Sequence, residues 1–161
     1  MTDLSLERLH ELLKYNQRTG FFIRKISRQQ YHKGLIAGCL NRKGYRVITI
    51  DSRQYLASRL AWFYVHGSWP KDEIDHRNGV RDDNRLANLR EASHSENQQN
   101  RRQAHKSNTT GFLGVSPNER KFRAQIKING NRLHLGNFAT PQEAHAAYVK
   151  AKRKLHPLGL L

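Results

Sequence analysis

The first hundred residues carry hydrophobic positions in short blocks with different spacings. Leu6, Leu9 and Leu13 have the spacing of a short helix over residues 5–14. A β-rich run after Gly44, with Val47, Ile48 and Ile50, leads through a turn at 51–52 into an apolar helix that ends at Gly67. Such short segments favour small folded units.

The pattern changes from Gly111 onward. Apolar and polar residues alternate along three short stretches, which predicts three strands, and the Asn-Gly-Asn sequence at 129–131 predicts a hairpin turn. Thr140, Pro141 and Glu143 are typical of the start of a helix. We therefore predict a three-stranded antiparallel sheet with its apolar face packed on one helix. The polar face of this sheet carries Arg123, Gln125, Lys127, Arg132 and His134.

Composition identifies the kind of partner. The 161 residues carry a net charge of +16, with a pI near 10.6, which indicates binding to a polyanion. No run approaches the roughly 18 apolar residues that a membrane span needs. The single cysteine, Cys39, excludes a disulfide within the chain and a Cys-based zinc knuckle, and it favours a reducing, intracellular location. Nucleic acid is the expected partner.

One stretch departs from this basic character. About half of the Asp and Glu residues lie between Asp72 and Glu96. Within it, Asp75 is a hard oxygen ligand of the kind that Mg²⁺ prefers, and His76 is a base near neutral pH. Asn88 and Asn97 have amides that can orient an imidazole or offer an oxygen to a metal. We expect a strand ending at His76, a second strand near 88–92, and a helix from Ser93 to about residue 102, with the capping-box residue Glu96.

This stretch resembles the HNH nuclease motif, in the variant found in small phage and intron homing endonucleases. The similarity covers roughly residues 40–102 and rests on the Asp-His pair, "DDNRLANLR" and "HSEN". It implies that His76 is the first His, a general base oriented by Asn88. It also implies that Asp75 and Asn97 hold one divalent ion. Because Asn97 stands where other members have His, the resemblance favours Mg²⁺, with Mn²⁺ as a substitute, over zinc.

The C-terminal segment resembles the Apetala-2-type DNA-binding domain over roughly residues 108–154. The similarity rests on "GVS", "KFRAQIKING", "HLGNF" and "TPQEAHAAY", with Phe122 in place of the usual Trp. It implies that the sheet lies in the DNA major groove, so that its polar face contacts DNA.

Together these observations predict an α+β protein in three parts. Residues 1–102 form an HNH nuclease domain with its core motif at about 72–102, residues 103–110 form a linker, and residues 111–161 form the DNA-binding domain. The expected function is site-specific, homing-type cleavage of double-stranded DNA, with nicking slightly favoured. We expect a monomer with no membrane or small-molecule partner, in the cytoplasm of a phage-infected bacterial host.

Simpler interpretations stand beside this one. An Asp-His pair is more often a surface ion pair or a turn cap than a catalytic site, and the polar sheet face is an ordinary solvated face in many proteins. Asp82, Asp83 and Asn84 are interpreted as residues that shape a loop. A non-enzymatic DNA-binding regulator with a degenerate nuclease module is the main alternative function. A nuclease acting on RNA is less favoured, because A-form RNA hides its major groove.

Overall fold

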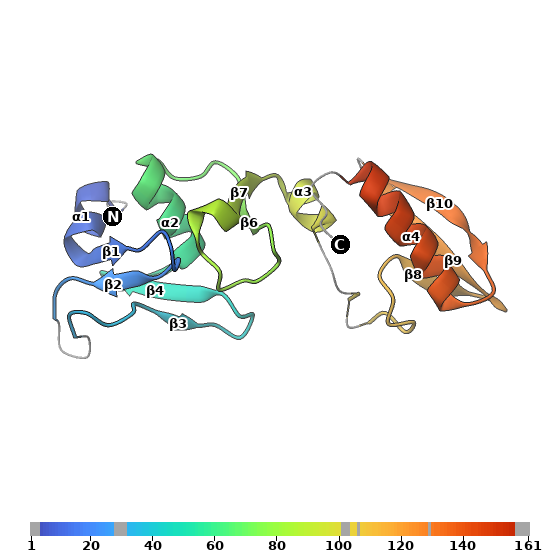
Figure 1. The fold of residues 1–161 in the computed structure, drawn as a ribbon, viewed down its shortest axis with the longest axis horizontal. Helices are drawn as coiled ribbons and strands as arrows, with labels where there is room; N and C mark the ends of the chain where they lie inside the picture. Colours follow the sequence, from blue (N-terminus) through green and yellow to red (C-terminus); the bar gives the residue numbers. More distant parts are fainter. Residues whose placement is uncertain (1–3, 28–31, 101–103, 106, 129, 157–161) are drawn as a thin grey trace. The chain divides into compact units, whose positions relative to one another are not determined.

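The computed structural model describes residues 4–27, 32–100, 104–105, 107–128 and 130–156. The chain forms two compact units, Met1–Ala92 and Ser93–Leu161. The described residues form four α-helices and several small antiparallel sheets, which confirms the mixed α+β class (Figure 1). The boundary after Ala92 precedes the predicted one at 102–103, and the predicted domain limits stay a prediction.

The first unit combines two helices with short strands. Its elements are α1 (Leu6–Leu12), β1 (Leu13–Tyr15), β2 (Phe22–Arg24), β3 (Cys39–Leu40), β4 (Arg46–Ile50), β5 (Arg53–Leu56), α2 (Ala57–His66), β6 (Glu73–His76), the 3-10 helix η1 (Leu86–Asn88) and β7 (Leu89–Ala92). Strands β1 and β2 pair, strands β3, β4 and β5 form a sheet in that order, and β6 pairs with β7, all antiparallel.

Local signals in the sequence explain most of these boundaries. The Ser5 hydroxyl accepts a hydrogen bond from the Arg8 amide and begins α1. The helix ends at Leu12, two residues before the predicted end, because Leu13 starts β1 and is fully buried. Asp51 and Ser52 both have positive φ in the β4–β5 turn. Gly67 has φ 70° and ends α2 as predicted.

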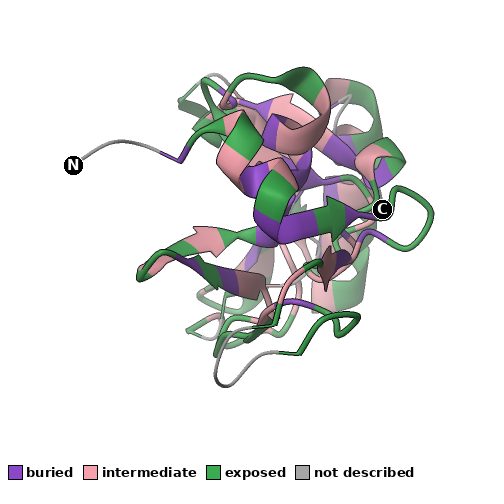
Figure 2. Cartoon of the chain, turned by 90° about the vertical axis from the view of Figure 1, so that its left-hand side faces the viewer, coloured by how far each residue is buried: buried purple, intermediate pink, exposed green. Residues whose placement is uncertain are grey.

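The core of the first unit lies between the helices and the strands. Leu9, Leu13, Phe22, Ile48 and Leu60 are almost wholly buried in one cluster. Buried and exposed stretches alternate along the ribbons, as expected for elements with one face on a core (Figure 2). This packing joins the N-terminal segment 4–24 to α2 and β4, so the later hairpin β6–β7 is attached to a formed scaffold.

The second unit is the predicted sheet on a helix. It contains α3 (His94–Gln99), β8 (Val115–Asn118), β9 (Lys121–Ile128), β10 (Asn131–Phe138) and α4 (Pro141–Leu155), and the sheet order is β10-β9-β8. Helix α4 covers one face of this sheet (Figure 1). Thr140 and Glu143 form a complete capping box with Pro141 in the first turn, which confirms the predicted start.

A β-bulge in β10 sets which residues share a face. The pairing with β9 shifts between His134 and Gly136, so Leu135 is an extra residue. Without the bulge, strict alternation would place Asn137 on the helix side. With it, Asn137 lies opposite Arg123, and Phe138 lies opposite Phe122 on the apolar face.

Three details differ from the sequence predictions or lie outside the described residues. Leu133, expected on the buried face, is 46% exposed at the edge of the sheet. Helix α3 ends at Gln99 with Asn100 as its C-cap, whereas residues 101–103 lie outside the described part. Residue 129 of the predicted hairpin turn also lies outside it. None of the helices in the described ranges is long and apolar enough to cross a membrane.

Candidate active site

The β6–β7 hairpin positions the predicted Asp-His pair. In its register, Asp75 lies opposite Arg90, and His76 lies opposite Leu89. Neighbouring residues of a strand point to opposite faces, so Asp75 and His76 project to different sides of the hairpin. Both residues are buried, at 5% and 4% exposure.

Asp75 forms a buried ion pair across the two strands. Its Oδ2 accepts hydrogen bonds from Arg90 Nε at 2.8 Å and from Arg90 Nη2 at 2.6 Å. The two side chains are 6% and 10% exposed. Directly opposed residues of an antiparallel pair have neighbouring Cβ atoms, which makes this contact a natural cross-strand pair. The hairpin therefore depends on Asp75 for charge balance around Arg90.

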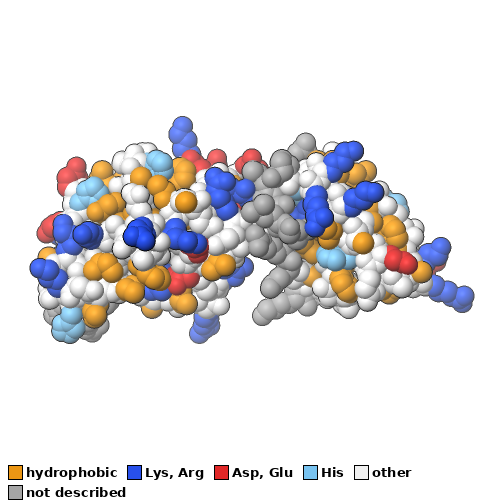
Figure 3. All heavy atoms as spheres, in the orientation of Figure 1, with side chains coloured by type: hydrophobic (Ala, Val, Ile, Leu, Met, Phe, Trp, Pro, Cys, Tyr) orange, Lys and Arg blue, Asp and Glu red, His pale blue; other side chains and the backbone are white. Residues whose placement is uncertain are grey.

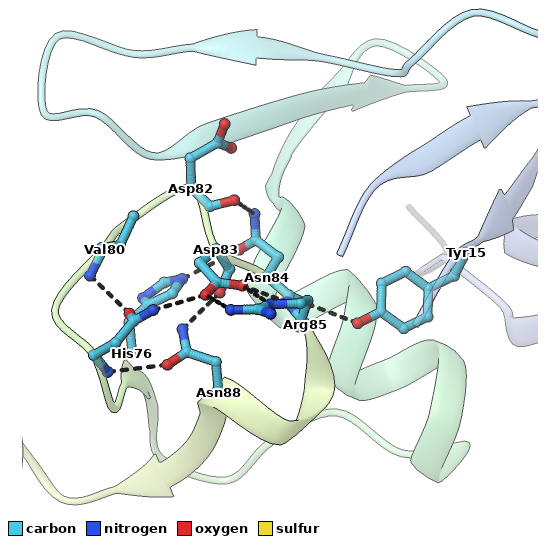
Figure 4. Close-up of polar contacts among 9 residues, drawn as sticks. Tyr15, His76, Val80, Asp82, Asp83, Asn84, Arg85 and Asn88 are labelled. Atoms are coloured by element: carbon cyan, nitrogen blue, oxygen red, sulfur yellow. Dashed lines mark hydrogen bonds and ion pairs between the residues drawn. The ribbon is translucent and has the colours of Figure 1, made fainter. Parts of the chain in front are cut away.

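His76 is held by Asn84, which is 1% exposed. Nε2 of the ring lies 3.2 Å from Asn84 Oδ1. The Asn84 amide nitrogen donates to the Asp82 carbonyl, which fixes the amide orientation and leaves Oδ1 as an acceptor. An amide oxygen can only accept, so Nε2 carries the hydrogen, and Nδ1 is the basic atom of the neutral ring (Figure 4).

Burial also sets the charge of this imidazole. The pKa of His76 is lowered below 6.5, first because burial disfavours the charged ring, against the opposing effects of Asn84 and the nearby carboxylates of Asp75, Asp83 and Asp82. The ring is therefore neutral at neutral pH, and this is the form of histidine that can accept a proton.

Asn88 joins the two ends of the loop between β6 and η1. Its Oδ1 accepts a hydrogen bond from the Asn78 amide at 2.9 Å, and its Nδ2 donates to the Asp83 carbonyl at 2.7 Å. The sequence interpretation gave Asn88 the task of orienting His76 and left Asn84 to the loop. In the structure a direct hydrogen bond joins the ring to Asn84, and Asn88 holds the loop that carries Asn84 (Figure 4). The orienting role of Asn88 stays a prediction.

Two other acids of this stretch, Asp82 and Asp83, also hold the loop through ion pairs and hydrogen bonds. Asp82 forms a two-bond ion pair with Arg46, at 2.8 Å for each bond. Asp83 pairs with Arg85 and also accepts from Asn78. Arg46 also donates to the Gly38 carbonyl at 3.1 Å, so its guanidinium links the loop to the segment before β3.

A comparison with known families identifies this segment. Residues 55–99 match the family of the HNH endonuclease. The match begins in β5 and ends in α3, and it includes Asp75, His76, Asn84, Asn88 and Asn97. It indicates a nuclease or DNA-related function. No curated protein and no solved structure matches the chain.

The HNH match ends before the C-terminal sheet. Asn97 lies in α3, within the second unit, so its predicted position at a metal beside Asp75 stays a prediction. The capping box of Ser93 and Glu96 that begins α3 is present as predicted. Asp75 and His76 end a strand and Asn97 lies in a helix, as predicted, whereas Asn88 lies in η1 and not in the predicted strand. The structure brings His76 together with Asn84.

The predicted metal ligands, Asp75 and Asn97, lie in different units, and their shared ion stays a prediction. Within the described ranges, no three His, Cys, Asp or Glu side chains gather as a metal-binding group. Asp75 has a carboxylate, and Mg²⁺ commonly binds through one or two carboxylates, waters and substrate phosphates. A carboxylate has about four acceptor positions, so pairing with Arg90 is compatible with metal binding. An ion would nevertheless share this carboxylate with Arg90.

The predicted DNA-contact residues lie together on the polar face of the second unit. Register pairs Lys127 with Arg132 and Gln125 with His134, and Arg123 lies opposite Asn137. Arg123 also donates to Asn118. Strands β8, β9 and β10 contain no Asp or Glu. Lys and Arg side chains are spread over the visible face of each unit, and acidic side chains are fewer (Figure 3).

The lowered pKa of His76 predicts a pH effect on stability. In the unfolded chain the exposed imidazole takes up a proton more readily, so the contribution of His76 is fully present above pH 6.5. It is lost as the pH falls through the lower pKa of the folded state. Chemical denaturation at pH 7.5 and pH 5 should show a larger loss of stability in the native protein than in His76→Gln. If the two proteins lose the same stability between pH 7.5 and pH 5, the His76 ring is not buried in its neutral form.

Proposed function

We propose that this protein is a metal-dependent endonuclease that cleaves double-stranded DNA at specific sites, in the manner of homing endonucleases. The observation that carries the proposal is the buried, neutral His76, fixed by Asn84 inside a segment that matches the HNH endonuclease family. The net charge of +16 supports a polyanionic substrate.

His76 is the proposed general base. Nδ1 takes the proton from the water that attacks phosphorus, because Nε2–H is engaged by Asn84 Oδ1. Asn88 maintains the loop geometry through its bonds to the Asn78 amide and the Asp83 carbonyl. The ring does not have to lose a proton first, since it is neutral at neutral pH.

Asp75 and Asn97 are the residues proposed to hold one Mg²⁺ or Mn²⁺ ion. When bound, such an ion supplies positive charge that stabilises the developing charge on the phosphate and the leaving oxygen. Asp75 provides the negative charge for binding, and Arg90 holds its carboxylate in place. The hairpin directs Asp75 and His76 to opposite faces, which suits a base and an ion acting from different sides of one phosphate.

The C-terminal sheet is the proposed recognition element, similar to an Apetala-2-type domain. A three-stranded sheet with Arg, Lys, Gln and His on one face has the donors that major-groove base edges and phosphates accept. The bulge in β10 adds Asn137 to this face beside Arg123. We propose residues 1–102 as the nuclease domain and 111–161 as the recognition domain, acting as a monomer.

Cleavage of supercoiled plasmid tests the function. Purified protein with Mg²⁺ should convert a plasmid library containing randomised sites to nicked or linear DNA, and EDTA should abolish this. Sequencing the ends would give the site and the strands cut. The rival function, a DNA-binding regulator without cleavage, is supported if the protein binds DNA tightly but cuts no library member with Mg²⁺ or Mn²⁺.

Charge removal from the sheet should reduce the salt dependence of DNA binding. We expect Lys127→Ala/Arg132→Ala to lower the slope of log affinity against log salt by about 1.8, since each phosphate contact contributes about 0.9. Binding titrations at several salt concentrations measure this slope. Lys150→Ala/Arg153→Ala is the matched control, because it removes the same charges from exposed positions of α4, on the other side of the sheet. Equal slopes for the two double variants would contradict the proposed DNA face.

A further inference from the structure

The N-terminal segment reaches the residue that holds His76. Tyr15, the last residue of β1, donates from its hydroxyl to the main-chain carbonyl of Asn84 at 2.6 Å, in a buried hydrogen bond between residues 69 apart in sequence. The main-chain carbonyl of Asn84 thus accepts a hydrogen bond from Tyr15, and the Asn84 side chain contacts His76 (Figure 4). Tyr15 lies outside the HNH match at 55–99.

The Tyr15 ring is itself firmly held. It packs on Phe22 with ring centroids 4.9 Å apart and on Tyr64 at 5.8 Å. Tyr15 is 6% exposed, and burial raises its pKa to about 12, so the phenol keeps its proton and remains a donor over the working pH range. A fixed donor of this kind holds the Asn84 carbonyl at one position.

Gly20, in the β1–β2 turn, makes a second close contact with the backbone of Asn84 and Arg85. A Cβ added at Gly20 would lie 2.5 Å from the Arg85 amide nitrogen and 2.6 Å from the Asn84 carbonyl carbon. Gly20 also has φ +76°, a conformation that favours glycine. The turn therefore approaches Asn84 and Arg85 as closely as a glycine allows.

We propose that Tyr15 is a positioning residue for His76, acting through Asn84. The Tyr15 hydroxyl and the Gly20 backbone fix the main chain at Asn84, and the Asn84 amide oxygen then selects the tautomer and orientation of the ring. The inference rests on the proposed function for its effect on cleavage, but the geometry of the ring can be measured without cleavage. It assigns part of the active-site geometry to the N-terminal segment.

Tyr15→Phe tests the proposal with little change in packing. It removes one hydroxyl and keeps the ring against Phe22 and Tyr64. Tyr64→Phe is the matched control, since it removes a hydroxyl from the same aromatic cluster, and within the described ranges that hydroxyl has no hydrogen bond to Asn84. We expect Tyr15→Phe to lower kcat about fivefold to tenfold with KM and DNA affinity unchanged. We expect Tyr64→Phe to cleave as the native protein does.

Nitrogen NMR of the His76 ring provides the readout that does not depend on cleavage. The native protein should show the Nε2–H tautomer, Tyr15→Phe a mixture of tautomers, and Tyr64→Phe the native pattern. An unchanged ring in Tyr15→Phe, whether or not kcat falls, overturns the proposal.

Gly20→Ala provides an independent variant. Gly34→Ala is its control, because Gly34 has φ +89° and a Cβ there would meet nothing within 4 Å. Both changes introduce similar backbone strain, but only Gly20→Ala should alter the His76 tautomer. If Gly20→Ala alters the His76 tautomer but the native protein cleaves no DNA, the positioning role is supported and the proposed function is rejected. If the His76 ring shows the same tautomer in Gly20→Ala and Gly34→Ala, the contact at Gly20 does not help to position the ring.

Discussion

Replacing His76 with Ala is expected to reduce DNA cleavage about 10² to 10⁴-fold, the usual contribution of a general base. The physical reason is the loss of the only group in the proposed mechanism that takes the proton from water. DNA affinity should change little, because binding depends mainly on the basic residues. Single-turnover cleavage and binding titrations on the same DNA measure the two quantities.

Two further variants make this result specific. His76→Gln keeps most of the buried volume and should lose cleavage to a similar degree. His66→Ala makes the same chemical change at an exposed position at the end of α2, where the ring packs only on Trp62 among the described aromatic contacts, and it should cleave normally. Substantial cleavage by His76→Gln would reject His76 as the base.

The second large effect concerns the buried pair of Asp75 and Arg90. Asp75→Leu should destabilise the protein by about 3 to 5 kcal/mol, because Arg90 would keep a buried charge without its partner. Asp75→Leu/Arg90→Met replaces the pair with apolar side chains and should recover most of the stability. Chemical denaturation at constant pH measures both values.

Cleavage by the double variant separates the two roles of Asp75. If Asp75 only balances Arg90, the folded double variant should cut DNA. If Asp75 also holds the divalent ion, it should remain inactive despite its recovered stability, and we expect this second result. Arg90→Met is the control that leaves a carboxylate for the ion. Normal cleavage by the double variant would remove Asp75 from the proposed metal site.

The acidic residues between Asp72 and Glu96 form more ion pairs within the fold than their composition indicated. Asp82 and Asp83 bind Arg46 and Arg85, and Asp75 binds Arg90. Each pair fixes a part of the hairpin or its loop around His76. The concentration of acids therefore provides counterions for arginines in the scaffold, in addition to the proposed ligand for a metal ion.

Elements with local signals were predictable from sequence. The capping boxes at Ser93 and Thr140 and the helix end at Gly67 all formed as predicted, because the groups that interact lie within a few residues of one another. The strands of the second unit followed from alternation of apolar and polar residues. The Asp-His pair was likewise found at the end of its strand, as the pattern indicated.

The contacts that complete the site were not predictable in this way. Asn84 was interpreted as a loop residue, since an asparagine between Asp and Arg has the composition of a turn, and nothing local indicates burial. Tyr15 is 69 positions from Asn84, and the bulge at Leu135 interrupts the alternation of apolar and polar residues in the third strand. The Tyr15–Asn84 hydrogen bond joins distant segments, whereas the Asn84–His76 contact and the bulge depend on how a loop folds and how two neighbouring strands pair.

The sequence by itself determined the basic character, the mixed α+β elements, the sheet on its helix, and the position of Asp75 and His76 on one strand end. Only the tertiary structure decided that Asn84, held by Tyr15, contacts His76 and that Arg90 pairs with Asp75. Caps, turns and alternation arise from neighbouring residues, whereas a buried hydrogen bond between distant segments exists only after the core has brought them together.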